Sequence, residues 1–143
     1  GYSAVGLINT KTEANVGGAL RACYCYDASI VAIQGKRYQR ESTDTSSCWR
    51  KIPLLHTDNL LNMIPFDCIP IAIERTEYAK NLISFTHPER AFYIFGPEDG
   101  SIPKEIMTHC KFVLQIPTTI SMNLASTVNV VLYDRLAKLA RTK

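Results

Sequence analysis

The chain has 143 residues and a mass of 16.0 kDa, a size that favours one domain folded around its own core. Hydrophobic residues make up 46% and charged residues 20%, which excludes an intrinsically disordered chain. The apolar runs at 66–73 and 91–95 end far short of the roughly 20 residues that a membrane helix requires. The amino-terminal residues lack a signal-peptide pattern, so we expect a cytoplasmic protein that does not lie in a membrane. From its size we expect a single domain over residues 1–143.

Net charge and cysteine content say little about which partner or metal the protein binds. Sixteen basic and thirteen acidic side chains give a formal net charge of +3, which is compatible with a nucleic-acid partner but does not by itself indicate one. The five cysteines show no CxxC spacing, and Cys23 and Cys25 are too close together for a zinc knuckle. We therefore expect reduced, mostly buried thiols and no bound metal.

The first 35 residues predict a β–α–β unit. Ser3–Asn9 form a short apolar run that predicts a strand, and Asn15–Tyr26 predict a helix with a Gly-Gly pair at its start. Ser29–Gln34 are β-branched and apolar, which predicts a second strand that ends at Gly35. A helix that connects two such strands is typical of a parallel sheet.

The rest of the chain continues the alternation of strands and helices. Gly35–Trp49 is polar, and we expect a loop or a broken helix there. Further strands are predicted at Leu54–His56, Cys68–Glu74, Ala91–Phe95 and Lys111–Ile116. Helices are predicted at Thr57–Met63, with Thr57 or Asp58 as cap, at Tyr78–Ser84 as a helix or turn, at Pro103–His109 with Pro in the first turn, and at Met122–Arg141. The pattern predicts an α/β fold, a mostly parallel sheet with helices on both faces.

Three loops that follow predicted elements carry unusual residues, and loops at the carboxyl ends of parallel strands are where ligands bind. In the first loop, Asn15–Arg21, Gly17 and Gly18 would allow close approach of the backbone to an anion such as phosphate, within reach of Arg21. A glycine-tolerant turn with Arg21 in a surface salt bridge explains the same residues.

The second loop, Phe95–Gly100, follows a strand directly. Gly96 and Gly100 can adopt positive φ angles, and Pro97 stiffens the turn. Glu98 is expected either to accept a hydrogen bond or bind a cation, or else to lie in a solvated turn. The segment matches neither the P-loop nor the GxGxxG pattern, which excludes those nucleotide sites.

The third loop, Ile116–Thr127, joins the last strand to the long helix and is rich in hydroxyl side chains. Ser121 is a good helix cap, and the alternative is a polar cluster that converges on a small ligand. No Ser–His pair is expected, because His56, His87 and His109 lie in unrelated segments.

Taken in order, the three loops resemble the motifs of the SpoU-type (TrmH-like) RNA ribose 2′-O-methyltransferases of the SPOUT class. Each match is weak alone, but the three together at these spacings are specific, and they cover the chain from about Ala4 to Ala137. The matching segments are Asn15-x-Gly17-x-x-x-Arg21, Phe95-Gly96-Pro97-Glu98-x-Gly100, Ile116-Pro117, Ser121-Met122-Asn123-Leu124 and Leu132-Tyr133-Asp134.

The resemblance implies a SPOUT fold with a deep C-terminal trefoil knot, S-adenosylmethionine as methyl donor and a homodimer with its active site at the subunit interface. It implies methyl transfer to a ribose 2′-OH of tRNA. The alternatives are ribosomal RNA as substrate and a non-catalytic RNA-binding paralogue of the same fold. A small-molecule-binding α/β protein with coincidental motifs is a further alternative.

The resemblance also implies which residues form the site. The catalytic residues would be Arg21, Asn15, Ser121 and Asn123, and the cofactor-binding residues would be Ile73, Gly96, Glu98, Gly100, Ile116, Ser121 and Leu124. Because an arginine side chain stays protonated, Arg21 is expected to bind the phosphate beside the target ribose rather than act as a base. Candidate RNA phosphate contacts, which a solvated basic loop would also explain, are Lys36, Arg37, Arg40, Arg50 and Lys51.

Overall fold

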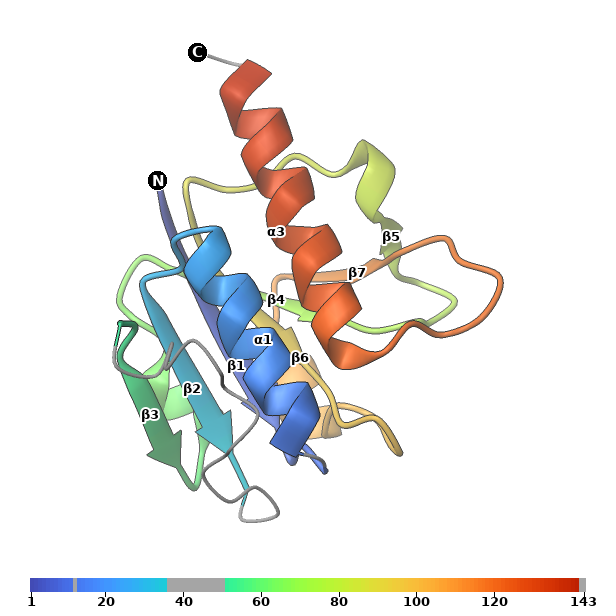
Figure 1. Ribbon diagram of the computed structural model, residues 1–143. Coiled ribbons are helices and arrows are strands. Elements are labelled where there is room, and N and C mark those ends of the chain that lie inside the picture. Colours follow the sequence, from blue (N-terminus) through green and yellow to red (C-terminus); the bar gives the residue numbers. More distant parts are fainter. Residues whose placement is uncertain (12, 36–50, 142–143) are drawn as a thin grey trace.

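A computed structural model describes residues 1–11, 13–35 and 51–141, and within them seven strands form one sheet (Figure 1). The strands are β1 (Tyr2–Ile8), β2 (Ile30–Gln34), β3 (Leu54–Thr57), β4 (Ile69–Ile73), β5 (Lys80–Asn81), β6 (Arg90–Phe95) and β7 (Phe112–Gln115). Their order across the sheet is β3-β2-β1-β6-β4-β7-β5, and every pairing is parallel. The predicted parallel sheet is confirmed, and each predicted strand is present with its ends shifted by at most one residue.

The sheet register brings the carboxyl ends of four strands side by side. Leu7 of β1 and Ile73 of β4 both pair with Phe95 of β6, and Ile73 also pairs with Leu114 of β7. The chain first runs from β1 outward to β3 and then returns to the other side of β1, so its direction across the sheet reverses between β1 and β6. Such a reversal is the usual place for a ligand in a parallel α/β fold.

Two helices cover one face of the sheet and lie side by side in Figure 1: α1 (Glu13–Cys25) and α3 (Leu124–Arg141). Their apolar residues pack with the alternate strand residues that point to this face, among them Val5, Leu7 and Tyr93. On the opposite face a second core contains Leu60 of the short helix η2 (Leu60–Met63) and Ile106 of α2 (Lys104–Met107). Helices on both faces are therefore confirmed, although those on the second face are short.

The start of α1 differs from the prediction. The helix begins at Glu13, so Gly17 and Gly18 lie in its second turn rather than at its amino end. Only the first four amides of a helix lack intrahelical partners, so the proposed phosphate site on glycine amides is wrong. Gly18 has a packing role instead, because a Cβ there would lie 2.7 Å from the Cβ of Ala125 in α3.

The helix caps also differ from the predictions. Asn59, rather than Thr57 or Asp58, caps η2, and its Oδ1 accepts a hydrogen bond from the backbone amide of Leu61 at 3.1 Å. Asn123, rather than Ser121, caps α3, and its Oδ1 accepts from the amide of Ser126 at 2.8 Å. Several neighbouring residues were suitable caps in each loop, and the position where each helix begins decided between them.

Two other segments refine the predictions. The segment 78–84 contains the two-residue strand β5 and a 3-10 turn, η3 (Leu82–Ser84), rather than an α-helix. Pro103 precedes α2 as its N-cap residue instead of lying in the first turn. The trefoil knot stays a prediction. Among the described residues, no helix has the length and apolar character needed to cross a membrane.

A buried polar network attaches α3 to the sheet. The imidazole of His87 lies between the hydroxyl of Tyr93 and a carboxylate oxygen of Asp134, at 2.7 Å from each. The guanidinium of Arg135 donates to the backbone oxygens of residues 88 and 89 at 2.7 and 2.8 Å. Burial lowers the pKa of His87 and raises the pKa of Tyr93 to about 12. Asp134, the last residue of the third motif, therefore has a structural partner far from the loops described above.

Candidate functional site

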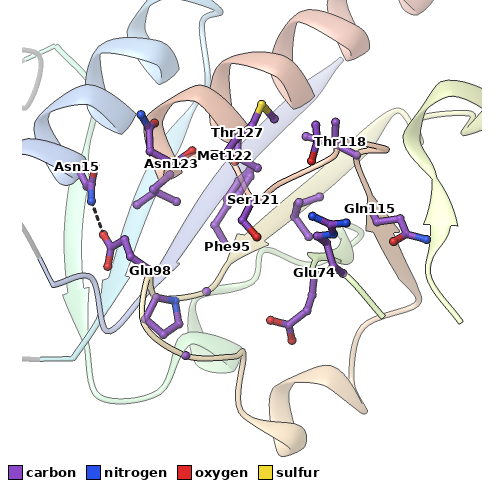
Figure 2. A pocket seen from close by; sticks show the side chains of 17 residues that line it. Asn15, Glu74, Phe95, Glu98, Gln115, Thr118, Ser121, Met122, Asn123 and Thr127 are labelled. Atoms are coloured by element: carbon purple, nitrogen blue, oxygen red, sulfur yellow. Dashed lines mark hydrogen bonds between the residues drawn. The ribbon is translucent and has the colours of Figure 1, made fainter. Parts of the chain in front are cut away.

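A pocket of about 590 Å³ opens at the carboxyl ends of β4, β6 and β7, beside the first turn of α1 (Figure 2). Its volume lies in the range of small-molecule sites. Nine of the ten predicted site residues line this pocket: Asn15, Ile73, Gly96, Glu98, Gly100, Ile116, Ser121, Asn123 and Leu124. Residues from four distant segments are thus brought together, while their individual roles stay predictions.

The carboxylate of Glu98 fastens the second loop to α1. Its Oε1 accepts a hydrogen bond from Nδ2 of Asn15 at 2.8 Å, as Figure 2 shows, and its Oε2 accepts from the backbone amide of Lys11 at 3.0 Å. A carboxylate is also electrostatically favoured near the amino end of a helix. Of the alternatives for Glu98, the hydrogen-bond acceptor is the one observed.

A second carboxylate, that of Glu74, lies on the opposite side of the same loop. Both of its oxygens are 3.3 Å from the backbone amide of Ile102. Burial raises the pKa of this carboxyl group, although the Ile102 hydrogen bond acts in the other direction. The loop from Gly96 to Ile102 is therefore held by one acidic side chain on each side.

The walls of the pocket are partly apolar. Leu124 and Phe95 are buried at its base, and Ile73 and Ile116 lie beside them. Polar groups at the rim include Ser121, whose exposed side chain points toward the pocket in Figure 2. An apolar cavity with a few polar groups suits a ligand that has an aromatic ring and a polar tail.

Arg21 is the predicted site residue that does not line the pocket. It lies on the third turn of α1, and its side chain is exposed. Arg21 follows Asn15 by six residues, which places it about 9 Å along the helix and about 120° away around its axis. The two residues therefore lie on different sides of α1.

Several pocket residues were missed by the sequence analysis. Glu74 and Arg75 directly follow the carboxyl end of β4, so the rule that selected the other loops would have found them too. Their segment contains no glycine and matches no motif, which is why it was not selected. The other residues missed are Phe95, Pro97, Gln115, Thr118, Met122 and Thr127.

The predicted RNA contacts are only partly described. Lys36, Arg37, Arg40 and Arg50 lie outside the described residues. Lys51 is exposed, and its ammonium group is 4.6 Å from the centre of the Tyr24 ring. Among residues 1–11, 13–35 and 51–141, no cluster of His, Cys, Asp and Glu could hold a metal ion.

Solved structures with the same fold are described as methyltransferases or as a tRNA modifying enzyme. The SpoU methyltransferase AviRb from Streptomyces viridochromogenes superposes with a TM-score of 0.87 at 13% identity, over 98% of this chain and 61% of that one. A TrmH/SpoU tRNA modifying enzyme from A. aeolicus gives a TM-score of 0.87 at 17% identity, over 98% of this chain and 76% of that one. AviRb has also been crystallised in complex with the cofactor AdoMet, and that structure gives a TM-score of 0.85 at 15% identity, over 97% of this chain and 58% of its own.

One structure, described as giving insight into the 2-OH methylation of C/U34 on tRNA, is matched over nearly its whole length. It covers 97% of this chain, the match extends over 91% of that protein, and the TM-score is 0.81 at 20% identity. No curated protein sequence matches the chain significantly. The model of the SpoU rRNA methylase family matches residues 3–133. This match spans most of the sequence and agrees with the fold, so the chain belongs to the SpoU rRNA methylase family.

Proposed function

We propose that the protein transfers a methyl group from S-adenosylmethionine to a ribose 2′-OH of tRNA. The observation that carries the proposal is the convergence of the three motif loops on one partly apolar pocket at the carboxyl ends of parallel strands. A tRNA substrate is favoured because two proteins of the same fold are described with tRNA, one as a tRNA modifying enzyme and one by the 2-OH methylation of C/U34. The trefoil knot of the SPOUT fold is part of the same proposal.

The pocket residues fit this donor. Ile73, Phe95, Ile116 and Leu124 supply apolar surface for an adenine ring, and the backbone around Gly96 supplies polar groups without side-chain bulk. When bound, the donor supplies an activated methyl group on a sulfonium. The residues of this chain then orient it, because a ribose hydroxyl is a weak nucleophile and alignment provides much of the rate.

The polar residues position the walls of the pocket and bind the RNA. Asn15 and Glu98 hold each other and fix the second loop against α1. Asn123 caps α3 and so places the side of the pocket formed by Leu124. Arg21 carries a permanent positive charge and binds the phosphate beside the target ribose, leaving the hydroxyl proton to a phosphate oxygen or to water.

We infer further that two chains form a homodimer and that Arg21 reaches the pocket of the partner. Arg21 and Asn15 lie on different sides of α1, and Arg21 does not line the pocket of its own chain, which favours a site that combines residues from two chains. Helix α3 also exposes an apolar stripe with i, i+3, i+6 spacing, formed by Val130, Tyr133 and Leu136, of which Tyr133 is 59% and Leu136 54% exposed. Burying such a stripe favours association.

Methylation of total RNA with isotopically labelled S-adenosylmethionine, followed by separation of tRNA from ribosomal RNA and nucleoside mapping, tests the reaction. We expect label in a 2′-O-methylated nucleoside. Label in a methylated base, or in ribosomal RNA alone, would contradict ribose or tRNA specificity. Donor binding without transfer to any RNA would identify a non-catalytic paralogue instead. Light scattering of the wild type and of Leu136→Glu tests the dimer, and a monomeric wild type would refute it.

A further inference from the structure

Glu74 extends β4 by one residue and starts from a rigid position. Its backbone amide donates to the oxygen of Leu114 at 2.9 Å, which continues the β4–β7 pairing beyond the last residue of the strand. From this fixed point the side chain reaches across to the segment that follows β6, where both carboxylate oxygens lie 3.3 Å from the backbone amide of Ile102. The side chain therefore joins the ends of two neighbouring strands.

Ile102 in turn sets the position of Gly96. The Ile102 side chain is buried, and a Cβ on Gly96 would lie 3.0 Å from its Cγ1 and 3.2 Å from its backbone nitrogen. The two ends of loop 96–102 are thus close together, and a side chain at residue 96 would require Ile102 to shift by a few tenths of an ångström. A shift of the Ile102 amide moves the backbone of Gly96, which lines the pocket.

Glu74 and Glu98 hold this loop from opposite sides. Glu98 fastens its tip to Asn15 and Lys11. Glu74 holds the last residue of the loop, Ile102, against the end of β4. The Ile102 amide lies beside a fully packed side chain, and the loss of its acceptor would leave a buried donor without a partner.

We propose that Glu74 is a positioning residue for the methyl-donor pocket, acting through the Ile102 amide on the backbone of Gly96. This proposal rests on the proposed function in identifying the ligand. The hydrogen-bond acceptor is the feature that matters, so glutamine, which keeps a side-chain oxygen in the same place, can replace glutamate. Alanine cannot.

Three variants separate this role from others: Glu74→Ala, Glu74→Gln and the control Glu77→Ala, which removes an exposed carboxylate from the same segment outside the pocket. Calorimetry with S-adenosylmethionine should show binding up to about tenfold weaker for Glu74→Ala, the effect of losing one hydrogen bond to the loop. Binding by Glu74→Gln and Glu77→Ala should stay within about twofold of the wild type. In tRNA methylation, Glu74→Ala should raise the KM for the donor more than it lowers kcat.

Hydrogen exchange provides a readout that does not depend on the donor. The Ile102 amide should exchange faster in Glu74→Ala than in the wild type, and at the wild-type rate in Glu74→Gln. Unchanged exchange and donor binding in Glu74→Ala, or equal impairment of the alanine and glutamine variants, would overturn the proposal. A wild-type protein that does not bind the donor would refute the proposed function, while the exchange rates would still decide whether Glu74 positions the loop.

Discussion

The contact between α1 and α3 at Gly18 leads to a quantitative prediction. A Cβ on Gly18 would lie 2.7 Å from the Cβ of Ala125, whereas carbon atoms at optimal contact are about 3.5–4.0 Å apart. The substitution Gly18→Ala therefore requires the two helices to separate locally by about 1 Å. Both helices pack on the same core, so they cannot separate without disturbing it.

Two contributions of opposite sign determine the free energy of unfolding of this variant. Alanine in place of glycine in a helix interior stabilises by about 1 kcal/mol. Overpacking a core contact destabilises by about 1–3 kcal/mol. We expect a net loss of about 1 kcal/mol, which corresponds to a Tm lower by about 4 °C for a chain of this size. Donor binding should weaken as well, because Leu124 in the first turn of α3 lines the pocket.

Thermal unfolding followed by circular dichroism, at one fixed protein concentration, measures the effect. Ala14→Gly on the exposed side of the same helix isolates the propensity contribution and should lower stability by about 1 kcal/mol. The double variant Gly18→Ala/Ala125→Gly exchanges the two side chains, so it should be more stable than the sum of the single changes predicts. A Gly18→Ala protein that is more stable than the wild type would refute the steric reasoning, and so would strict additivity in the double variant.

Three further predictions concern the loop, the subunits and pH. Glu98→Ala removes the acceptor for the Asn15 side chain and the Lys11 amide, so the methylation rate should fall by about tenfold or more. The control Glu77→Ala should keep its activity. Equal rates in the two variants would contradict a role for the Glu98 hydrogen bonds. A mixture of Arg21→Ala and Gly96→Val proteins, each inactive alone, should regain methylation because a mixed dimer has one intact site, and no recovery would argue against a shared site. Burial lowers the pKa of His87 below its ordinary value of 6.5, despite the hydrogen bond to Asp134 and with Lys138 and Arg135 nearby, so the unfolded chain binds a proton that the folded chain excludes. The stability that depends on neutral His87 is therefore fully present above about pH 6.5 and is lost as the pH falls toward the folded-state pKa of His87. Between about pH 7.5 and about pH 5.5, the free energy of unfolding in urea should fall more for the wild type than for His87→Gln. Equal losses would assign the effect to other groups.

The sequence by itself determined the local structure and the position of the functional loops. Runs of apolar and β-branched residues identified the long strands to within one residue, because side-chain packing on a buried parallel sheet leaves a strong compositional signal. Motif residues at Gly96 and Ser121 identified loops that follow strands, and Asn15 identified the start of the helix that follows the first strand. The sequence did not show β5, since a two-residue strand buries too little surface to leave a pattern.

The tertiary structure decided everything that depends on which distant groups meet. Gly18 resembled a turn residue in the sequence, but it packs against α3. Asn123 is the helix cap because α3 begins at Leu124, two residues later than predicted. Because α1 begins at Glu13, Arg21 lies on its third turn and does not line the pocket. Glu74 entered the site because β4 lies between β6 and β7, and His87 found Asp134 across 47 residues of chain. Contacts of this kind are set by strand order and helix packing, which sum many weak interactions between distant segments, and no short stretch of sequence records them.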